Sequence, residues 1–533
     1  MSSEPAPRDA GPAAGPAILV RSVEVDGHDL PVDVLVEGGV VTDVGLALAP
    51  RGDVEVVDGE GAALLPGLHD HHVHLLAMAA RAAGLDLDGL PTPAAVDAAL
   101  RAAAPSSPST TFGPTSSGPN SPPPDETVRS MRVPAREKRT VSGRGGVAGG
   151  GIAGGGVRWV RASGYDEHRH GPMDRRRLDA VAPGVAVRVQ HRSGLGWVLS
   201  TPALRAVGLL TEDGTVAPHH PKGVELGSDG TPTGWLLRLD GWLGERVPPS
   251  PIDLAVTGRC LAAAGVTGVT DATYALGAER LERLRRAVTS GELPQRVVLL
   301  GVEPGEVDGG WARVGPAKLL ADESLGLDPS ALAAAIVRHH RAGRPVAIHA
   351  VTRAENVVAV AALAEAGALP GDRIEHGSVL PPELDPVLAT SGVTVVAQPS
   401  LVTERGDHHL ATVEDHDLPH LHRHASLLAH GVRVGVGSDA PVTTADPWAG
   451  ISAASTRRTR GGATVGPDEA VDARTALGWY LADPSDPGGP PRRIRPGAPA
   501  DLCLLDGPLA DVLAAPSVER VRATWAAGRL VHR

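Results

Sequence analysis

The sequence alternates between short apolar runs and segments with helical periodicity, and this alternation restricts the fold more than any other feature. The apolar runs that fit buried parallel strands cover residues 185–190, 266–271, 296–300, 316–320, 346–349, 373–376, 393–398 and 432–437. Segments 331–342 and 354–366 are the clearest of the helical segments between them. Strand–helix alternation on this scale predicts an α/β fold with a parallel sheet, either open or closed into a barrel.

Both ends of the chain carry a different pattern, in which short strands are separated by Gly and Asp turns. The pattern covers residues 17–25, 32–44 and 54–57 near the start, and 501–506 and 521–531 near the end. A chain of 533 residues exceeds the roughly 250–300 residues that one compact core usually holds. We therefore expect a small β unit made from both ends of the chain, around a large middle domain.

The region 105–156 breaks the alternation. Of its 52 residues, 27 are Gly, Ser or Pro, and it includes the stretch SSPSTTFGPTSSGPNSPPP. Such a composition cannot bury enough apolar surface to offset the entropy of an ordered chain. We predict a disordered insertion at 105–156, and a disordered tail at 1–16.

Charge and cysteine content exclude several classes of protein. The formal net charge of -12 is spread along the chain, which disfavours nucleic acid or an anionic membrane as the partner. The two cysteines, Cys260 and Cys503, cannot form a disulfide framework, so a reducing cytoplasm is the expected location. Residues 1–15 lack the apolar segment of a secretory signal, and no run of about 18 apolar residues predicts a membrane helix.

Four histidines fall within the stretch LLPGLHDHHVHLLA at 64–77. Because side chains alternate along a strand, they form two pairs on opposite faces, His69 with His71 and His72 with His74. Alternation alone does not choose between the pairs. Asp70 shares the face of His72 and His74, where a carboxylate can support a metal-bound imidazole. The cluster favours a site for a Zn-type ion over a polar loop.

Three further side chains that can bind metal end separate apolar runs. His349 ends the run in RPVAIHAVT, His376 the run in DRIEHGSVL, and Asp439 the run in VRVGVGSDAPV. Glu375, one position before His376, is expected on the opposite face of its strand. In (β/α)₈ barrels the carboxyl ends of the strands form the active site, so the three side chains are predicted to meet there.

Two glycines and a lysine in these apolar runs are also informative. Gly435 and Gly437 precede Asp439 and allow another backbone to approach closely. Lys318 lies in VGPAKLLADES and is one of three lysines in the chain. A lysine in such a strand is either neutral or paired with a carboxylate such as Asp322.

Together these motifs resemble the amidohydrolase superfamily. LLPGLHDHHVHL is similar to its signature P-G-x-x-D-x-H-x-H, and AIHA, RIEHGSVL and GVGSDAPV follow in the order of its later metal and acid/base residues. A finer resemblance is to the amidohydrolase type 3 group, the relatives of N-substituted formamide deformylase. The stretches that carry it are GYDEHRHGPMDRRRLD, HRSGLGWVLSTPAL, DGTPTGWLL, DPWAGISAASTR and IRPGAPADLCLLD. It covers nearly the whole chain except the N-terminal tail and 105–156.

The resemblance implies a (β/α)₈ TIM-like barrel with a small β-sandwich domain built from both chain termini. The barrel would cover 63–489, and the sandwich 17–62 with 490–533. Within the barrel, the family pattern selects His72 and His74 as ligands of one divalent ion, together with Asp439. It leaves His69 and His71 outside the site.

The same resemblance assigns the remaining candidate ligands. His349 and His376 would hold a second ion, or bind substrate if the site holds only one. Lys318 would bridge two ions if it is carboxylated, as in some members of the superfamily; its alternative role is the ion pair with Asp322. The implied cofactor is a divalent metal, Zn²⁺, with one or two ions per chain.

The implied activity is hydrolysis of a non-peptide C–N bond in an amide, formamide or cyclic amide. A bound ion lowers the pKa of water to about 7, and the resulting hydroxide attacks the carbonyl carbon. Asp439 would accept the proton of the water and pass it to the leaving nitrogen, with His376 as the second catalytic residue. Hydrolysis of an ester or lactone, deamination of a ring, or a catalytically inactive binding barrel are the alternatives.

The substrate is expected to be a small molecule. Tyr165, Arg192 and Arg458 lie in loop-like parts of the motifs and are candidate substrate contacts, or else anchor those loops. A homodimer is compatible with the resemblance, although no interface can be recognised in the sequence.

Overall fold

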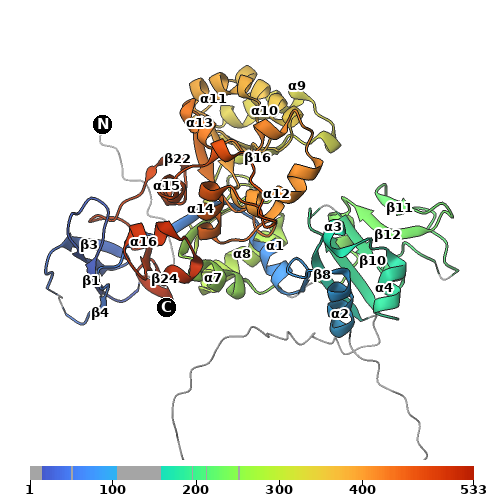
Figure 1. Ribbon diagram of the computed structural model, residues 1–533, viewed down its shortest axis with the longest axis horizontal. Helices are drawn as coiled ribbons and strands as arrows, with labels where there is room; N and C mark the ends of the chain where they lie inside the picture. The colour runs from blue at the N-terminus through green and yellow to red at the C-terminus, as the bar shows by residue number, and fades with distance from the viewer. Residues whose placement is uncertain (1–14, 50–51, 105–157, 195, 212, 250–251) are drawn as a thin grey trace, which may run out of the picture. The chain divides into compact units, whose positions relative to one another are not determined.

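The computed structural model describes residues 15–49, 52–104, 158–194, 196–211, 213–249 and 252–533 (Figure 1). The chain divides into two compact units, the first from Met1–Ala82 and Ser250–Arg533, the second from Ala83–Pro249. The predicted insertion at 105–156 lies outside the described residues, as does most of the predicted tail.

Two four-stranded sheets of the first unit are built from both ends of the chain. One has the order β3-β2-β1-β4, with β1 at Ile18–Val23, β2 at Val32–Glu37, β3 at Val40–Gly45 and β4 at Glu55–Asp58. The other has the order β25-β24-β23-β5, with β5 at Leu64–Pro66, β23 at Leu502–Leu505, β24 at Val521–Ala526 and β25 at Arg529–His532. Buried side chains of both sheets, among them Val34, Leu504 and Trp525, form one apolar core. Figure 1 shows these N-terminal strands in blue beside β24 in red.

The middle of the first unit holds two parallel sheets. The four-stranded sheet has the order β15-β14-β13-β6, with β6 at Leu68–Val73, β13 at Val266–Asp271, β14 at Arg296–Leu299 and β15 at Arg313–Val314. The five-stranded sheet has the order β16-β17-β18-β19-β20, with β16 at Ala317–Leu320, β17 at Val346–Ala350, β18 at Arg373–His376, β19 at Thr394–Ala397 and β20 at Arg433–Val436. The predicted α/β fold with parallel strands is therefore confirmed.

Backbone hydrogen bonds join the two parallel sheets at both edges. The amide of Asp439, just after β20, donates to His72 O in β6 over 2.7 Å. At the other edge, the amide of Lys318 in β16 donates to Leu300 O, just after β14, over 3.3 Å. The carboxyl ends of β6 and β20 therefore lie together, which brings the histidine stretch beside Asp439.

Helices connect the strands and cover the sheets. The α-helices of the first unit are α1 Leu75–Ala82, α7 Leu254–Ala263, α8 Ala278–Ser290, α9 Pro329–Arg341, α10 Arg353–Ala366, α11 Asp385–Ser391, α12 Ser400–Thr412, α13 Ala425–Ala429, α14 Pro447–Thr456, α15 Ala473–Leu481 and α16 Leu509–Ala514. Short 3₁₀ turns cover Glu323–Leu325, Pro382–Leu384, Leu418–His420, Pro467–Glu469 and Val518–Arg520, and a hairpin joins β21 Ala482–Asp483 to β22 Asp486–Pro491. Helices α9 and α10 match the two predicted helical segments. The start of α10 is fixed by a capping box between Thr352 and Glu355.

The second unit has a sheet of its own, which the sequence pattern did not indicate. Its order is β11-β12-β10-β9-β8-β7, with β7 at Leu85–Asp86, β8 at Trp159–Tyr165, β9 at Ala186–His191, β10 at Gly196–Leu199, β11 at Val224–Leu226 and β12 at Pro232–Leu237. The helices are α2 Pro93–Ala103, α3 Glu167–His170, α4 Arg175–Val181, α5 Thr201–Ala206 and α6 Asp240–Gly244.

The prediction that 185–190 belongs with the other parallel strands is wrong. The strand forms as β9, but it lies in the mixed sheet of the second unit, parallel to β8 and antiparallel to β10. A tight turn through Gly194, with a positive φ of 76°, sends the chain straight back along β9. An apolar run shows that a strand is buried but not which sheet it joins.

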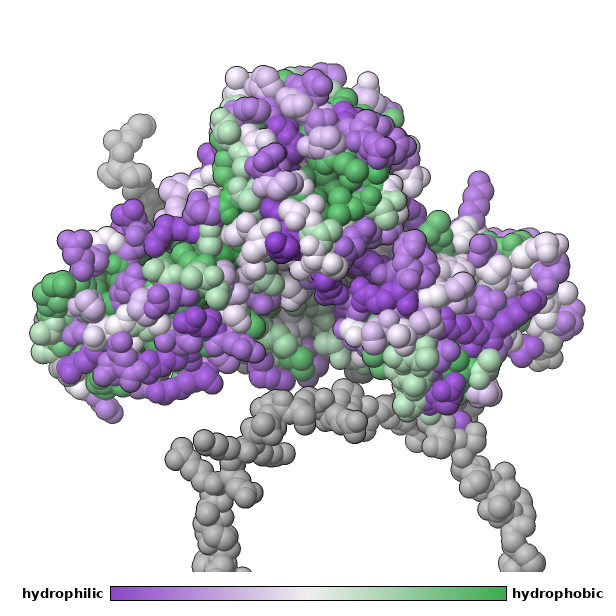
Figure 2. Space-filling view, viewed as in Figure 1, coloured by the Kyte–Doolittle hydropathy of each residue, from purple (hydrophilic) through white to green (hydrophobic). Residues whose placement is uncertain are grey.

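Hydrophobic residues also reach the surface of the first unit. In Figure 2 green areas are visible over the part formed by the N-terminal strands. Leu30, Leu46 and Val56 are the large apolar side chains most exposed there. Among the described residues, no helix has both the length and the apolar character needed to span a membrane.

Candidate metal centre

The structure brings His72 and His74 together with Asp439. One ligand atom from each of the three residues lies within 4.8 Å of the others, as a metal site requires. His74 Nε2 lies 3.1 Å from Asp439 Oδ1, and His72 Nε2 lies 3.5 Å from the same oxygen. His72 Nε2 is buried and forms no hydrogen bond within the described part of the chain. Two imidazole nitrogens and one carboxylate oxygen are a donor set that suits Zn²⁺, so these residues fit such an ion.

The position of Asp439 depends on the way β20 meets β6. Asp70 accepts hydrogen bonds from the Ser438 amide (2.9 Å), the Ser438 hydroxyl (2.5 Å) and the His72 amide (3.1 Å). Asp439 itself has a left-handed backbone, with φ 57°. The buried Asp70 carboxylate therefore ties the backbone on both sides of the candidate ligands.

Electrostatics favour the ionised form of Asp439. Burial alone would raise the pKa of this carboxyl, but the hydrogen bond from His74 holds the pKa below its ordinary value. Burial has the opposite effect on Asp70, whose pKa it raises to about 6. Asp439 is thus the more acidic of the two carboxyls, and the pKa of Asp70 lies closer to neutral pH.

Glu375 is a site residue that the sequence did not reveal. Its carboxylate contacts His72 Nδ1, and its other oxygen forms an ion pair with Arg373 Nε at 2.6 Å. The expectation that Glu375 points away from His376 is wrong, because His376 has a positive φ of 77° that breaks the alternation of the strand. The signal that could have identified it was an acid inside a buried apolar strand, next to a candidate ligand.

His376 and His349 lie near this group without belonging to the close cluster. The ring centre of His376 is 4.8 Å from that of His72 and 4.6 Å from that of His349. His376 Nδ1 lies 2.8 Å from Gln398 Oε1, a second contact that the sequence did not predict. Four imidazoles thus converge at the carboxyl ends of β6, β17 and β18.

Lys318 is buried in β16, with 8% of its surface exposed. Burial lowers the pKa of its ammonium group, although the negative charges of Glu375 and Asp439 oppose this shift. The ion pairs found among the described residues do not include Lys318 with Asp322. Asp322 accepts hydrogen bonds from the amide and hydroxyl of Ser324. Burial therefore makes the Lys318 ammonium more acidic than that of an exposed lysine.

His69 and His71 are buried elsewhere on β6. His69 Nε2 lies 2.9 Å from Thr270 Oγ1, and His71 Nε2 lies 3.2 Å from the carbonyl of Trp479. Burial lowers the pKa of both imidazoles, that of His71 to about 3. They are neutral core side chains rather than members of the cluster with Asp439.

The three candidate substrate contacts have structural partners of their own. In the second unit, the Tyr165 hydroxyl donates to Gly171 O over 2.8 Å, and Arg192 forms an ion pair with Asp166. In the first unit, Arg458 is exposed and its guanidinium donates to Gly462 O over 3.4 Å. These partners explain how each side chain is held.

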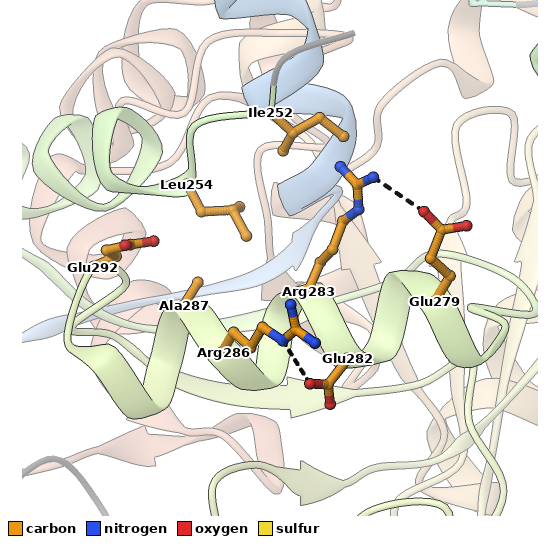
Figure 3. Close-up of a pocket in the computed structure, with 8 residues that line it drawn as sticks. All are labelled: Ile252, Leu254, Glu279, Glu282, Arg283, Arg286, Ala287 and Glu292. Atoms are coloured by element: carbon orange, nitrogen blue, oxygen red, sulfur yellow. Dashed lines mark hydrogen bonds and ion pairs between the residues drawn. The ribbon is translucent and has the colours of Figure 1, made fainter. Parts of the chain in front are cut away.

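A hollow of about 370 Å³ opens beside α8 (Figure 3). It is lined by Ile252, Leu254, Glu279, Glu282, Arg283, Arg286, Ala287 and Glu292. Four of the lining residues form two ion pairs, Arg283 with Glu279 at 3.0 Å and Arg286 with Glu282 at 2.6 Å. Its lining includes none of the candidate ligands.

Comparison with known proteins decides the family. The model of the Amidohydrolase family matches residues 55–532. The chain belongs to the amidohydrolase family. The resemblance predicted from the motifs is therefore confirmed.

Curated relatives of this amidohydrolase match over shorter stretches. The chain is 33% identical over 138 residues to the N-substituted formamide deformylase of Arthrobacter pascens, which is 25% of this chain and 26% of the deformylase. It is 49% identical over 57 residues to the dihydroorotase of Streptomyces coelicolor, which is 11% of this chain and 13% of the dihydroorotase. The match thus spans about a quarter of the deformylase and less of the dihydroorotase.

Solved structures match the amidohydrolase over nearly its whole length. An uncharacterized metal-dependent hydrolase from Pyrococcus horikoshii has a TM-score of 0.65 at 18% identity, with 92% of this chain and 97% of that chain covered. A second uncharacterized metal-dependent hydrolase, from Pyrococcus furiosus, has a TM-score of 0.62 at 18% identity. The match covers 92% of this chain and 99% of that chain. At this identity the likeness shows a shared fold.

Proposed function

We propose that this protein is a metal-dependent hydrolase that cleaves a non-peptide C–N bond in a small molecule. The observation that carries the proposal is the cluster of His72, His74 and Asp439, in which a buried imidazole nitrogen has no hydrogen-bond partner among the described residues. A buried polar atom without a partner is costly, and a bound cation would satisfy it. Membership of the amidohydrolase family supports the same class of reaction.

The remaining ligands are assigned within the same site. His72, His74 and Asp439 would hold one ion, taken to be Zn²⁺ from the mixed nitrogen and oxygen donors. His349 and His376 would hold a second ion or contact the substrate. Lys318, which is buried in β16, would bridge the two ions if it is carboxylated.

The chemistry divides between the ion and the chain. When bound, the ion supplies hydroxide at neutral pH, because it lowers the pKa of water to about 7. The Asp439 carboxylate, whose low pKa keeps it ionised, would accept the proton of the attacking water and return it to the leaving nitrogen. His376 is proposed as the second catalytic residue, with Nε2 as the ring nitrogen that would bind an ion or accept a proton from the substrate.

The substrate class follows from the relatives rather than from the site alone. The name of the Arthrobacter relative places N-substituted formamides among the first compounds to test, and amides and cyclic amides complete the proposed class. Tyr165, Arg192 and Arg458 are proposed to contact the substrate. Each alanine variant should then raise KM for the substrate more than it lowers kcat.

A finer description of the fold belongs to this proposal. Strands β6, β13, β14, β16, β17, β18, β19 and β20 would form one (β/α)₈ barrel, closed by the hydrogen bonds from Asp439 to His72 and from Lys318 to Leu300. The two sheets from the chain ends, which share one core, would form a β-sandwich. The predicted barrel would then cover 63–489 in the sequence and the sandwich 17–62 with 490–533, and the segment Ala83–Pro249 of the second unit would interrupt the barrel sequence.

The decisive experiment combines elemental analysis with turnover. Purified wild-type protein and the variants His72→Ala, Asp439→Ala and His28→Ala would be compared on a panel of N-formyl compounds, linear amides and cyclic amides. We expect bound zinc and turnover in the wild type and in His28→Ala, whose exposed histidine lies outside the site, and loss of both in the other two. Full activity in His72→Ala or Asp439→Ala would contradict the proposal. Activity only on esters, lactones or ring amines would support the metal site but would show that the enzyme does not cleave the proposed amide bond.

A further inference from the structure

Two of the converging histidines are held at one ring nitrogen by a buried side chain. His72 Nδ1 contacts the Glu375 carboxylate, and His376 Nδ1 lies 2.8 Å from Gln398 Oε1. We propose that Glu375 and Gln398 are positioning residues, which keep the proton on Nδ1 and leave Nε2 of each histidine free to bind a cation. This inference rests on the metal site of the proposed function.

Glu375 determines the tautomer of His72 because a carboxylate only accepts hydrogen bonds. His72 Nδ1 must therefore donate, so Nε2 of the neutral ring carries the lone pair. That Nε2 faces Asp439 Oδ1 at 3.5 Å and has no hydrogen-bond partner within the described residues. The lone pair of His72 is thus directed at the candidate metal position.

Arg373 holds the Glu375 carboxylate in place. Its Nε lies 2.6 Å from the second oxygen of Glu375, and its guanidinium donates to His71 O in β6 over 3.4 Å. Arg373 is 2% exposed and Glu375 is 0% exposed, so the pair is shielded from water. The carboxylate therefore lies between the Arg373 guanidinium, its ion-pair partner, and the His72 ring.

Gln398 determines the tautomer of His376 in the same way, through a hydrogen bond at Nδ1. Its Nε2 donates to Val396 O over 2.9 Å, so the amide oxygen is the atom that faces His376 Nδ1. An amide oxygen accepts, and His376 Nδ1 must therefore donate. The Nε2 lone pair of His376 is left for a cation or a substrate proton.

Substitution of Glu375 by glutamine tests the tautomer directly. The amide has one acceptor and one donor where the carboxylate has two acceptors, so it cannot satisfy both neighbours. Its oxygen will turn to the charged Arg373, and its NH₂ will face His72 Nδ1. His72 must then accept at Nδ1 and carry its proton on Nε2, which blocks metal binding.

The chain offers a matched control for each residue. Asp385 is also a buried carboxylate that contacts an arginine and a histidine outside the site, Arg423 Nη2 at 2.7 Å and His430 Nδ1 at 2.6 Å, both through Oδ2. Gln295 is buried like Gln398, and its amide donates to Gly258 O and Val266 O. Asp385→Asn and Gln295→Leu therefore reproduce the loss of a buried polar group without touching a candidate ligand.

The experiment measures two quantities on Glu375→Gln, Gln398→Leu and the two controls. The first is the Kd for Zn²⁺, from competition with a chromophoric chelator. The second is the imidazole tautomer in metal-free protein, from ¹⁵N spectra of histidine-labelled samples, with His72→Ala and His376→Ala to assign the signals. We expect Kd to rise about 10–100-fold in the two site variants and the tautomer signals of His72 and His376 to change, with neither of these changes in the controls.

The outcomes separate this inference from the proposed function. If wild-type protein binds Zn²⁺ and both site variants match the controls in Kd and tautomer, the inference is overturned and the proposed function stands. If wild-type protein binds no Zn²⁺, the proposed function fails, and the ¹⁵N spectra alone decide the inference. Unchanged tautomers in folded Glu375→Gln and Gln398→Leu would then overturn it.

Discussion

Gly437 lies against the backbone of His72 so closely that a Cβ added to the glycine would be 2.8 Å from His72 Cα. No other residue type fits there without moving β20 away from β6. The contact is what allows the Asp439 amide to donate to His72 O over 2.7 Å. Close approach at a residue without a side chain thus brings the ligands of two distant strands together.

Gly437→Ala should therefore damage the site as well as the fold. We expect a loss of about 1–3 kcal/mol in the free energy of unfolding, as for other overpacked positions, together with loss of bound zinc. Gly478→Ala, in helix α15, is the control. A Cβ added at Gly478 would contact only the Pro491 side chain, at an ordinary distance of 3.5 Å. Chemical denaturation and elemental analysis measure the two effects. A Gly437→Ala protein with wild-type stability and zinc content would show that the approach is not required.

Asp70→Ala should be far more harmful than Asp70→Asn. Alanine leaves two buried amides and the Ser438 hydroxyl without their acceptor, which should cost more than about 2 kcal/mol. Asparagine keeps one oxygen for the amides of His72 and Ser438, and its NH₂ can donate to the Ser438 hydroxyl. Urea unfolding of the two variants checks the difference. Equal stabilities would show that Asp70 does not tie β6 to β20.

Lys318→Ala tests whether the buried lysine bridges two ions. If it does, the wild type should bind two metal ions per chain and the variant should lose one, because a bridging ligand holds both. Lys222→Ala, at an exposed lysine, should leave the metal content unchanged. Elemental analysis gives the stoichiometry. An unchanged metal content in Lys318→Ala would refute the bridging role.

The buried histidines should make the protein less stable in mild acid. Burial holds the pKa of His69, His422 and His424 well below the ordinary value, so these rings remain neutral in the folded state. The unfolded chain takes up protons below about pH 6.5 and the folded chain does not. The contribution of these histidines to the free energy of unfolding is therefore fully present above that pH. It is lost as the pH falls, by up to about 1.4 kcal/mol per pH unit for each histidine.

His424→Gln should remove one of these contributions. Its amide oxygen can still accept from Arg457, whose guanidinium lies 3.2 Å from His424 Nδ1. Between pH 7 and pH 5.5 the variant should lose about 1 kcal/mol less stability than the wild type. Urea unfolding at the two pH values measures this, with His28→Gln at an exposed position as control. An identical pH dependence in His424→Gln and wild type would contradict the assignment.

Much of the fold could be predicted because local patterns report burial directly. Strands β13, β14, β16, β17, β18, β19 and β20 match the predicted apolar runs, and α9 and α10 match the predicted helices. The apolar run that became β9 shows the limit of this signal. Periodicity does not encode the partner of a strand, so the separate sheet of the second unit could not be inferred.

The candidate site was predictable where its residues carry recognisable spacing. The motifs offered two histidine pairs and Asp439, and the resemblance to the amidohydrolase superfamily selected His72 and His74. The structure places the ligand atoms of His72, His74 and Asp439 within 4.8 Å. Glu375 and Gln398 were not identified, because each depends on a contact with a residue of another strand. The left-handed backbone of His376, at φ 77°, also overturned the alternation that had placed Glu375 on the other face.

By itself, the sequence determined the class of fold, the order of the strands along the chain and the residue types that can bind a metal. These properties follow from composition and spacing, which act over short stretches of chain. Only the tertiary structure showed that the imidazoles selected by the family pattern lie beside Asp439, and which side chains hold them there. That choice depends on the contact of β20 with β6 and on the local backbone of His376 and Asp439. Neither is specified by a periodic pattern, because each arises from packing between residues far apart in the chain.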